Sequence, residues 1–295
     1  MSQAIRLIAI DIDGTLLDSR WQLSEQNRAA VLAAERRGIE IVLVTGRRFH
    51  FALPIADEIP CHLILIANNG AIIKSKAGET LSRHLLPQAI ARQIVAGVPE
   101  FKRSAILVFD VEGAGQIVME RAEWENPQVS GYLERNRQYL REVTPLESAI
   151  VADPIQVMYT GRVEEMNEVE RRLRALPCAD GFALAKTEYA ARDFTILDAI
   201  NRGCSKGAAL EEWVRRRGIP REQVMAIGDN LNDREMLFFS GLPVVMSNSV
   251  EPLKQNGWAT TLSNDESGVA AAIESLVLAP IESRSLETGE SELAP

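Results

Sequence analysis

The sequence predicts an α/β protein in which a doubly wound parallel sheet is interrupted by an inserted α+β domain. Near both ends of the chain, short and continuously apolar runs alternate with helical segments, as expected for strands buried on both faces of a parallel sheet. In the middle, strand-like runs follow one another as in hairpins, with helices between them. We expect a discontinuous core domain (1–81 and 196–280), an inserted domain (82–195) and a flexible acidic tail (281–295).

The first 70 residues contain three apolar runs that fit buried strands. IRLIAI (5–10) and IEIVLV (39–44) are rich in β-branched residues, and LILIA (63–67) follows them. Between the first two runs lies a helical segment that Ser24 can cap at its start and Gly38 can end. The order strand, helix, strand predicts a parallel βαβ unit.

The middle of the chain predicts a separate sheet. AILVFD (105–110) and GQIVME (115–120) are separated by a short glycine-containing loop, which indicates a hairpin. The other expected elements are three strands and one periodic helix: IQVMYT (155–160), EEMNEVERRLRAL (164–176), FALAKT (182–187) and DFTILD (193–198). These elements predict an α+β insert with its own antiparallel sheet.

The core pattern resumes after the insert. We expect a helix over 206–218, followed by strands at 224–227, 243–246 and 259–262. Both ends of the chain therefore build one doubly wound domain.

The composition disfavours several classes of protein. A net charge of −9 over 295 residues argues against a nucleic-acid partner. No apolar stretch approaches the roughly 18 residues that span a bilayer, and no secretion signal is visible, so we expect no membrane partner. The three cysteines, Cys61, Cys178 and Cys204, are far apart, which predicts a cytoplasmic location rather than a disulfide scaffold.

Polar side chains follow the first two predicted core strands. Asp11 and Asp13 come directly after the first strand, before a turn at Gly14, and Thr45 and Gly46 follow the second. Ligands bind at the carboxyl ends of parallel strands, so these residues are expected in one crevice. Two neighbouring carboxylates call for a cation or a shared proton, and a hydroxyl with free N–H groups suits phosphate. Taken alone, the first motif is equally compatible with an Asx turn or a helix cap, and a plain threonine N-cap is the favoured interpretation of the second.

Two later motifs add to the same crevice. Lys206 stands at a helix start, where the helix dipole disfavours a cation unless an anion is near. Asp229, Asn232 and Asp233 follow the strand at 224–227. Oxygen donors of this kind suit Mg²⁺. A solvated lysine and a plain turn are the alternatives for each motif taken alone.

In this order the motifs resemble those of the haloacid-dehalogenase-like phosphohydrolase superfamily, in its Cof-like sugar-phosphatase branch. DIDGTLLDS (11–19) is similar to the nucleophile loop, VTGR (44–47) to the threonine motif, CSKGAAL (204–210) to the lysine motif and IGDNLNDREML (227–237) to the G-D-x-x-N-D motif. The resemblance covers nearly all of residues 5–278. It implies a Rossmann-like core with an α/β cap inserted after the third strand.

The resemblance also implies roles for individual residues. Asp11 would be the nucleophile that forms an aspartyl-phosphate. Asp13 would be the general acid for the leaving oxygen and then the base for water. Mg²⁺ would be held by the carboxylates of Asp11 and Asp229 and the backbone carbonyl of Asp13, with support from Asp233. The phosphoryl oxygens would be held by Thr45, Gly46, Lys206 and Asn232.

These roles imply a Mg²⁺-dependent phosphatase for a small phosphorylated metabolite, with sugar phosphates the commonest class of the branch. The alternatives are a phosphomutase that uses the same loop, and a catalytically silent phospho-ligand sensor. A silent member is expected to have lost an essential motif residue, and none is lost here.

Substrate choice is expected to lie in the cap, where Trp124, Tyr189 and Arg192 could face the crevice. The sequence also departs from the family pattern, because Ser247 and Ser249 stand where glycine and alanine are common. That change is expected to alter the pocket rather than abolish activity.

Overall fold

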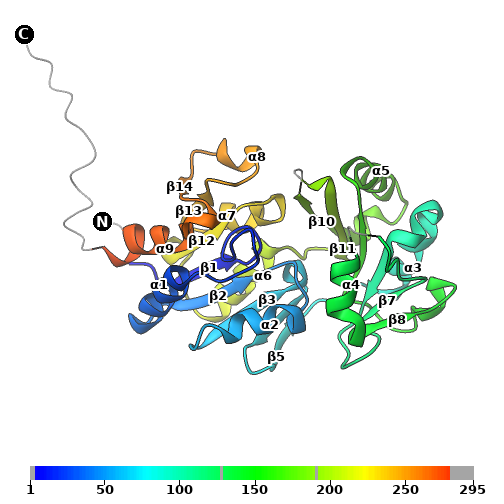
Figure 1. Ribbon diagram of the computed structural model, residues 1–295, viewed down its shortest axis with the longest axis horizontal. Helices are drawn as coiled ribbons and strands as arrows, with labels where there is room; N and C mark the ends of the chain where they lie inside the picture. Colours follow the sequence, from blue (N-terminus) through cyan, green and yellow to red (C-terminus); the bar gives the residue numbers. More distant parts are fainter. Residues whose placement is uncertain (1–3, 127–128, 190–191, 280–295) are drawn as a thin grey trace, which may run out of the picture.

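The computed structural model describes residues 4–126, 129–189 and 192–279. Its elements form two sheets with helices around them (Figure 1). The expected tail at 281–295 lies outside the described residues. In the described part, no helix is both long and apolar enough to cross a membrane.

The larger sheet has eight strands in the order β14-β13-β12-β1-β2-β3-β4-β5. Six of them are parallel: β1 (Leu7–Asp11), β2 (Glu40–Val44), β3 (Leu63–Ala67), β12 (Val224–Gly228), β13 (Leu242–Met246) and β14 (Ala259–Thr261). The remaining two, β4 (Ile72–Ser75) and β5 (Thr80–Arg83), add an antiparallel hairpin at one edge. The doubly wound parallel sheet is confirmed, and this hairpin is an addition to it.

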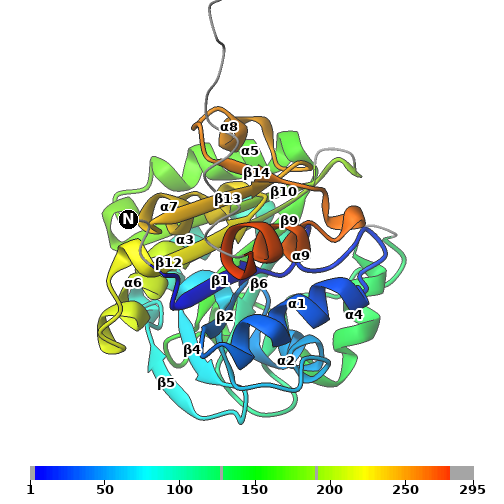
Figure 2. The same cartoon turned by 90° about the vertical axis from the view of Figure 1, so that its left-hand side faces the viewer.

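Helices cover both faces of the larger sheet (Figure 2). On one face, α1 (Glu25–Arg36), α2 (Phe49–Asp57) and α9 (Gly268–Ile273) pack against alternate strand residues such as Ile8 and Ile10. On the other face, α6 (Lys206–Arg216) and α7 (Arg234–Phe239) pack against the intervening residues. The short helix α8 (Glu251–Lys254) lies between β13 and β14 in the chain. Burial of both strand faces explains the continuous apolar runs in the sequence.

The smaller sheet has six strands in the order β10-β11-β9-β6-β7-β8. They are β6 (Ala105–Val108), β7 (Ile117–Met119), β8 (Leu140–Glu142), β9 (Gln156–Gly161), β10 (Phe182–Tyr189) and β11 (Phe194–Asn201). All neighbouring pairs are antiparallel except β7 and β8, which are parallel. The expected antiparallel insert is therefore wrong at that one pair. Helix α4 (Ser130–Asn136) lies between β7 and β8 in the chain and belongs to the crossover that lets β8 run in the same direction as β7.

The two faces of the smaller sheet differ. Helices α3 (Gln88–Gly97) and α5 (Val163–Arg174) pack on one face around Leu107, Val157 and Tyr159. The opposite face carries Ile106 and Met158, which belong to the same apolar cluster as α2 and α4. That face therefore turns toward the larger sheet.

Short 3₁₀ helices complete the chain at 68–70, 99–104, 137–139, 146–149, 179–181, 221–223, 231–233 and 264–266, and a π-helix follows at 274–278. The chain passes from the larger sheet to the smaller one after β5 and returns after β11. Domain boundaries at 82 and 195 stay a prediction, and we propose that the segment between the two crossings is the cap.

Candidate active site

The carboxyl end of β1 forms part of the floor of the site, by which we mean the loops at the carboxyl ends of β1, β2 and β12 together with the start of α6. Asp11 is its last residue, and its side chain is buried. The chain then turns at Gly14, whose φ of +82° suits glycine. A Cβ at this position would lie 2.5 Å from Oδ2 of Asp229, so the turn brings backbone directly against that carboxylate. Thr15 then donates from Oγ1 to Oδ1 of Asp229 at 2.9 Å.

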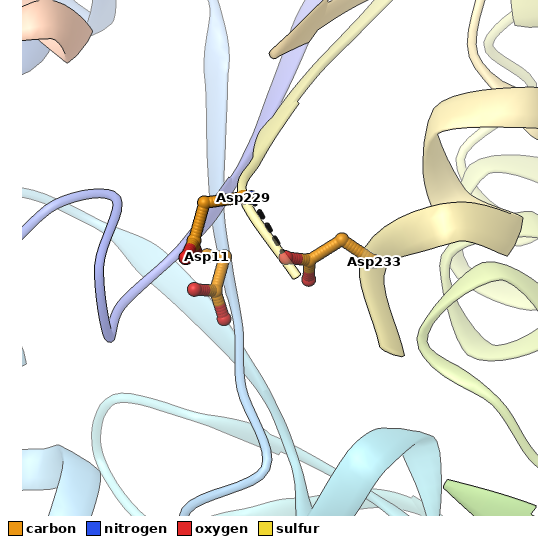
Figure 3. A group of neighbouring side chains, drawn as sticks. All are labelled: Asp11, Asp229 and Asp233. Carbon is orange, nitrogen blue, oxygen red and sulfur yellow. Dashed lines mark hydrogen bonds between the residues drawn. The ribbon is translucent and has the colours of Figure 1, made fainter. Parts of the chain in front are cut away.

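Three buried carboxylates meet between β1 and β12. Oxygen atoms of Asp11, Asp229 and Asp233 lie within 4.8 Å of one another (Figure 3). Asp229 follows β12 directly, and Asp233 ends the 3₁₀ helix after it. Oδ2 of Asp233 accepts the backbone N–H groups of Asp229 at 3.0 Å and of Asn230 at 2.9 Å, which fixes the loop.

Lys206, the first residue of α6, is buried among these carboxylates. Its Nζ lies 2.5 Å from Oδ1 of Asp11 and 2.6 Å from Oδ1 of Asp233. Burial lowers the pKa of Lys206, but the charges of Asp11 and Asp233 outweigh it and raise that pKa above its ordinary value. The side chain is therefore an ammonium group, as the sequence-based need for a nearby anion predicts.

The cluster holds more negative than positive groups. Burial raises the pKa of Asp11 to about 7, with a further contribution from the charge of Asp233 that Lys206 opposes. Burial, followed by the charge of Asp11, also raises the pKa of Asp229 well above its usual range. A cation would relieve this repulsion. Buried oxygen donors from three carboxylates fit a hard divalent ion such as Mg²⁺.

Asp13 forms an ion pair with Arg47. The guanidinium donates from Nε to Oδ2 of Asp13 at 2.7 Å, and a second nitrogen donates to Oδ1 at 2.5 Å. Arg47 also lies over the ring of Phe51, 4.8 Å from its centroid. The sequence motifs predict no role for Arg47, although it is the last residue of the VTGR motif.

The loop after β2 lies beside the loop after β3. Thr45 is buried, its N–H donates to Ile66 at 2.8 Å, and its Oγ1 accepts the N–H of Arg47 at 3.1 Å. A Cβ on Gly46 would lie 3.2 Å from Oδ1 of Asn69. That same Oδ1 accepts a hydrogen bond from Nδ2 of Asn232 at 2.9 Å. The structure therefore brings the two predicted loops that carry Thr45 and Asn232 together at one end of the sheet, with the loop after β3 between them.

A polar network joins the two sheets next to the site. Nδ2 of Asn68 donates to Oε1 of Gln156 at 3.0 Å, and Nδ2 of Asn69 donates to Oδ2 of Asp198 at 2.7 Å. Nε2 of Gln156 donates to the other oxygen of Asp198, also at 2.7 Å. Burial raises the pKa of Asp198 to about 7, against the lowering effect of the Asn69 hydrogen bond.

A cavity of about 1460 Å³ opens between the two sheets above this floor. Five predicted site residues line it: Asp11, Asp13, Gly46, Lys206 and Asn232. Thr45, Asp229 and Asp233 are buried outside its lining.

The three cap residues singled out from the sequence separate into two groups. Tyr189 and Arg192 border the cavity. Burial, followed by the charge of Asp13, raises the pKa of the Tyr189 hydroxyl above its usual range. Trp124 does not border the cavity, and the Arg137 guanidinium lies over its ring at 4.1 Å from the centroid.

One of the two unusual serines, Ser249, lies behind the loop that carries Asp229, and the other, Ser247, is exposed. Ser249 is buried, and its Oγ donates to the carbonyl of Gly228 at 3.3 Å. The side chain of Asn248 donates to the carbonyl of Gly14 at 2.8 Å. This segment therefore supports both halves of the floor, and neither serine borders the cavity.

Comparisons with known proteins identify the family and the fold of this chain. A family model described as haloacid dehalogenase-like hydrolase matches residues 8–273. The phosphatase YwpJ of Bacillus subtilis is 29% identical over 92% of this chain and 100% of its own length. An HMP-PP phosphatase of Serratia proteamaculans is 28% identical over 84% of this chain and 86% of its own. The crystal structure of a haloacid dehalogenase-like hydrolase from Bacteroides thetaiotaomicron is 28% identical, with a TM-score of 0.75 over 92% of this chain and 98% of that one. The chain belongs to the haloacid dehalogenase-like hydrolase family.

Proposed function

We propose that this phosphatase depends on Mg²⁺ and hydrolyses a phosphate monoester of a small metabolite through an aspartyl-phosphate on Asp11. The observation that carries the proposal is the buried Asp11 carboxylate at the cavity floor, with Lys206 Nζ 2.5 Å away and two further carboxylates beside it. Relatives of this chain include proteins named as phosphatases of small metabolites, which supports the same class of substrate for this protein.

The first step is attack by a carboxylate oxygen of Asp11 on phosphorus. A bond forms between that oxygen and phosphorus, and the ester P–O bond breaks. Lys206 and the loop residues Thr45, Gly46 and Asn232 hold the phosphoryl oxygens in this proposal. Their role is to offset the repulsion between a carboxylate and a phosphate dianion.

Asp13 handles the proton in both steps. It gives a proton to the leaving oxygen, and afterwards accepts one from the water that attacks the aspartyl-phosphate. That second attack breaks the Asp11–phosphate bond, releases inorganic phosphate and restores the carboxylate. Arg47 positions Asp13 by its two hydrogen bonds.

The carboxylates of Asp11 and Asp229, with the backbone carbonyl of Asp13, are the groups that would hold Mg²⁺, and Asp233 supports them by fixing the loop that carries Asp229. When bound, the ion supplies positive charge that neutralises the phosphoryl oxygens and the carboxylates around them. Sugar phosphates are the first substrates to test, because the motifs resemble the Cof-like sugar-phosphatase branch. A cytoplasmic location without a nucleic-acid partner stays a prediction. The three cysteines are free thiols, which supports that location.

The test is phosphate release from a panel of small phosphomonoesters, with Mg²⁺ and with EDTA. We expect turnover that needs Mg²⁺, is lost in Asp11→Asn and is kept in the control Asp57→Asn, whose side chain is largely exposed. Turnover in Asp11→Asn would overturn the proposed nucleophile. Transfer of phosphate within the substrate without release would indicate a phosphomutase, and binding without any reaction would indicate a sensor.

A further inference from the structure

Arg48 is a buried cation without a carboxylate partner. It precedes α2, borders the cavity and is only 7% exposed. Its two terminal nitrogens donate to neutral amides: one to Oε1 of Gln116 at 2.5 Å, the other to Oδ1 of Asn136. Among the residues that the structure describes, no carboxylate forms an ion pair with it. A guanidinium cannot shed its proton, so a positive charge stays uncompensated in a buried position.

A second arginine without a carboxylate partner lies close to the same wall. Arg135 of α4 is exposed at the cavity and lies over the ring of Phe51, 6.0 Å from its centroid. Tyr132 packs edge-on against Phe51. Burial raises the pKa of its hydroxyl, and the nearby charges of Arg48 and Arg135 oppose this rise. Within the described ranges, no carboxylate pairs with Arg135. Arg48, Arg135 and Tyr132 therefore form one polar group, which we name the arginine subsite.

One further donor beside Arg48 lacks a partner. Nε2 of Gln116, the amide whose oxygen accepts from Arg48, is buried and makes no hydrogen bond within the described part of the chain. Buried polar atoms are nearly always satisfied in a complete protein. Gln116 does not itself border the cavity, so its unpaired donor shows only that the polar surroundings of Arg48 are incompletely satisfied. The observation that points to an anion is the buried guanidinium of Arg48, which borders the cavity without a carboxylate partner among the described residues.

More basic than acidic side chains line the cavity as a whole. Nine basic side chains and six acidic ones line it, although the chain carries a net charge of −9. Asp11 and Asp13 are among the six and are engaged with Lys206 and Arg47 at the floor. Glu100, another of the six, pairs with Arg172, which is not a lining residue. Arg20 and Arg162, two of the nine basic residues, pair in turn with Asp18 and Asp193 outside the lining. The positive charge available to a further anion therefore lies at arginines such as Arg48 and Arg135, for which the described residues provide no carboxylate partner.

We propose that the arginine subsite binds a second anionic group of the substrate, a phosphate or a carboxylate, in addition to the ester phosphate at Asp11. This inference rests on the proposed function, and it narrows the substrate class to small metabolites with two anionic groups. Arginine suits both groups, because its planar fork binds their oxygens in pairs. Arg48 comes from the core and Arg135 from the proposed cap, so an anion bound by the two arginines contacts both domains.

The test compares three substrates of similar size: glucose 6-phosphate, 6-phosphogluconate and glucose 1,6-bisphosphate. We expect wild-type kcat/KM to be about tenfold or more higher for at least one doubly anionic substrate than for glucose 6-phosphate. The preferred one shows whether the second group is a carboxylate or a phosphate. In Arg48→Gln this ratio should fall to about 1, and Arg48→Lys should keep part of it because the charge remains.

Two further variants separate recognition from folding. Arg135→Gln changes an exposed residue and should lower the ratio without affecting stability. Arg137→Gln is the matched control, because Arg137 is exposed, pairs with Glu134 and does not line the cavity, so its ratio should equal that of the wild type. A wild-type ratio near 1, or an equal loss for all three substrates in Arg48→Gln, would overturn the subsite.

Calorimetric binding to Asp11→Asn keeps this inference distinct from the proposed function. The same three compounds should show the same order of affinity without turnover, and Arg48→Gln in that background should remove the order. Preference in binding without hydrolysis by the wild type would uphold the subsite and contradict the phosphatase chemistry. Hydrolysis by the wild type without a preference in binding would uphold the phosphatase chemistry and contradict the subsite.

Discussion

Gly14 occupies a position in which a side chain would collide with Asp229. Its φ of +82° is strained for other residues, and a Cβ would lie 2.5 Å from Oδ2 of Asp229. We expect Gly14→Ala to displace that carboxylate and to lower kcat/KM by about 100-fold, as small misplacements at a reacting centre do. Phosphate release with saturating Mg²⁺ measures the loss.

Gly78 provides the matched control. Its φ is +91°, but no atom lies within 4 Å of the Cβ that alanine would add. Gly78→Ala should therefore lower the free energy of unfolding by about 1–2 kcal/mol through backbone strain alone and leave kcat/KM unchanged. Equal losses of activity in the two variants would mean that strain, and not contact with Asp229, governs Gly14.

Sequence patterns predicted the residues of the floor better than the contacts between them. Asp11 and Lys206 could be placed because each stands at the end of a strand or the start of a helix. The ion pair between Asp13 and Arg47 could not, because it joins residues 34 positions apart and depends on side-chain direction. Lys206 was expected to meet phosphate, and in the structure it lies between Asp11 and Asp233.

At the scale of elements, strand β11 is tied to the loop after β3 through a single buried carboxylate, Asp198. Its pKa is about 7 in the folded protein and 3.8 for an ordinary aspartate. The folded state therefore binds more protons between these values, so this group makes the protein less stable as pH rises from about 4 to 7. At about 1.4 kcal/mol per pKa unit, the loss has an upper limit of roughly 4 kcal/mol.

Asp198→Asn removes this titration. We expect the free energy of unfolding of the variant, minus that of the wild type, to increase between pH 4 and 7 and to level off above pH 7. Urea unfolding at several pH values measures the difference, and Asp57→Asn on the surface should run parallel to the wild type. A difference that stays constant with pH would show that Asp198 is ionised throughout this range.

Apolar patterning explains which elements the sequence predicted. Strands β1, β2 and β3 are buried runs and were placed within two residues of their ends. The hairpin partner β5 (TLSR) and the three-residue β8 (LRE) are partly polar and exposed, so neither shows the pattern of a buried strand. Their pairing is set by neighbours that are distant in sequence or by the turn between them.

At the scale of the whole molecule, the cavity is the feature that local patterns do not predict. Its walls combine α2 of the core with α4 and β9 of the smaller sheet, which no window of sequence brings together. The floor could be predicted because the ends of parallel strands converge by topology. The partners of Arg48 are 68 and 88 positions away, so its lack of a countercharge emerges only in the folded chain.

The buried carboxylates also link the metal to the stability of the whole fold. Since Asp11 comes from the first strand and Asp229 and Asp233 come from one loop far along the chain, the unfolded chain has no such site, and Mg²⁺ should bind only the folded state. At a concentration 100 times its Kd, Mg²⁺ should add about 2.7 kcal/mol of stability, which raises Tm by about 5–10 °C. Thermal unfolding with Mg²⁺ and with EDTA measures the shift. Asp229→Asn should lose most of it and Asp57→Asn should keep it, because only the first change removes a ligand. An equal shift in all three proteins would place the ion elsewhere.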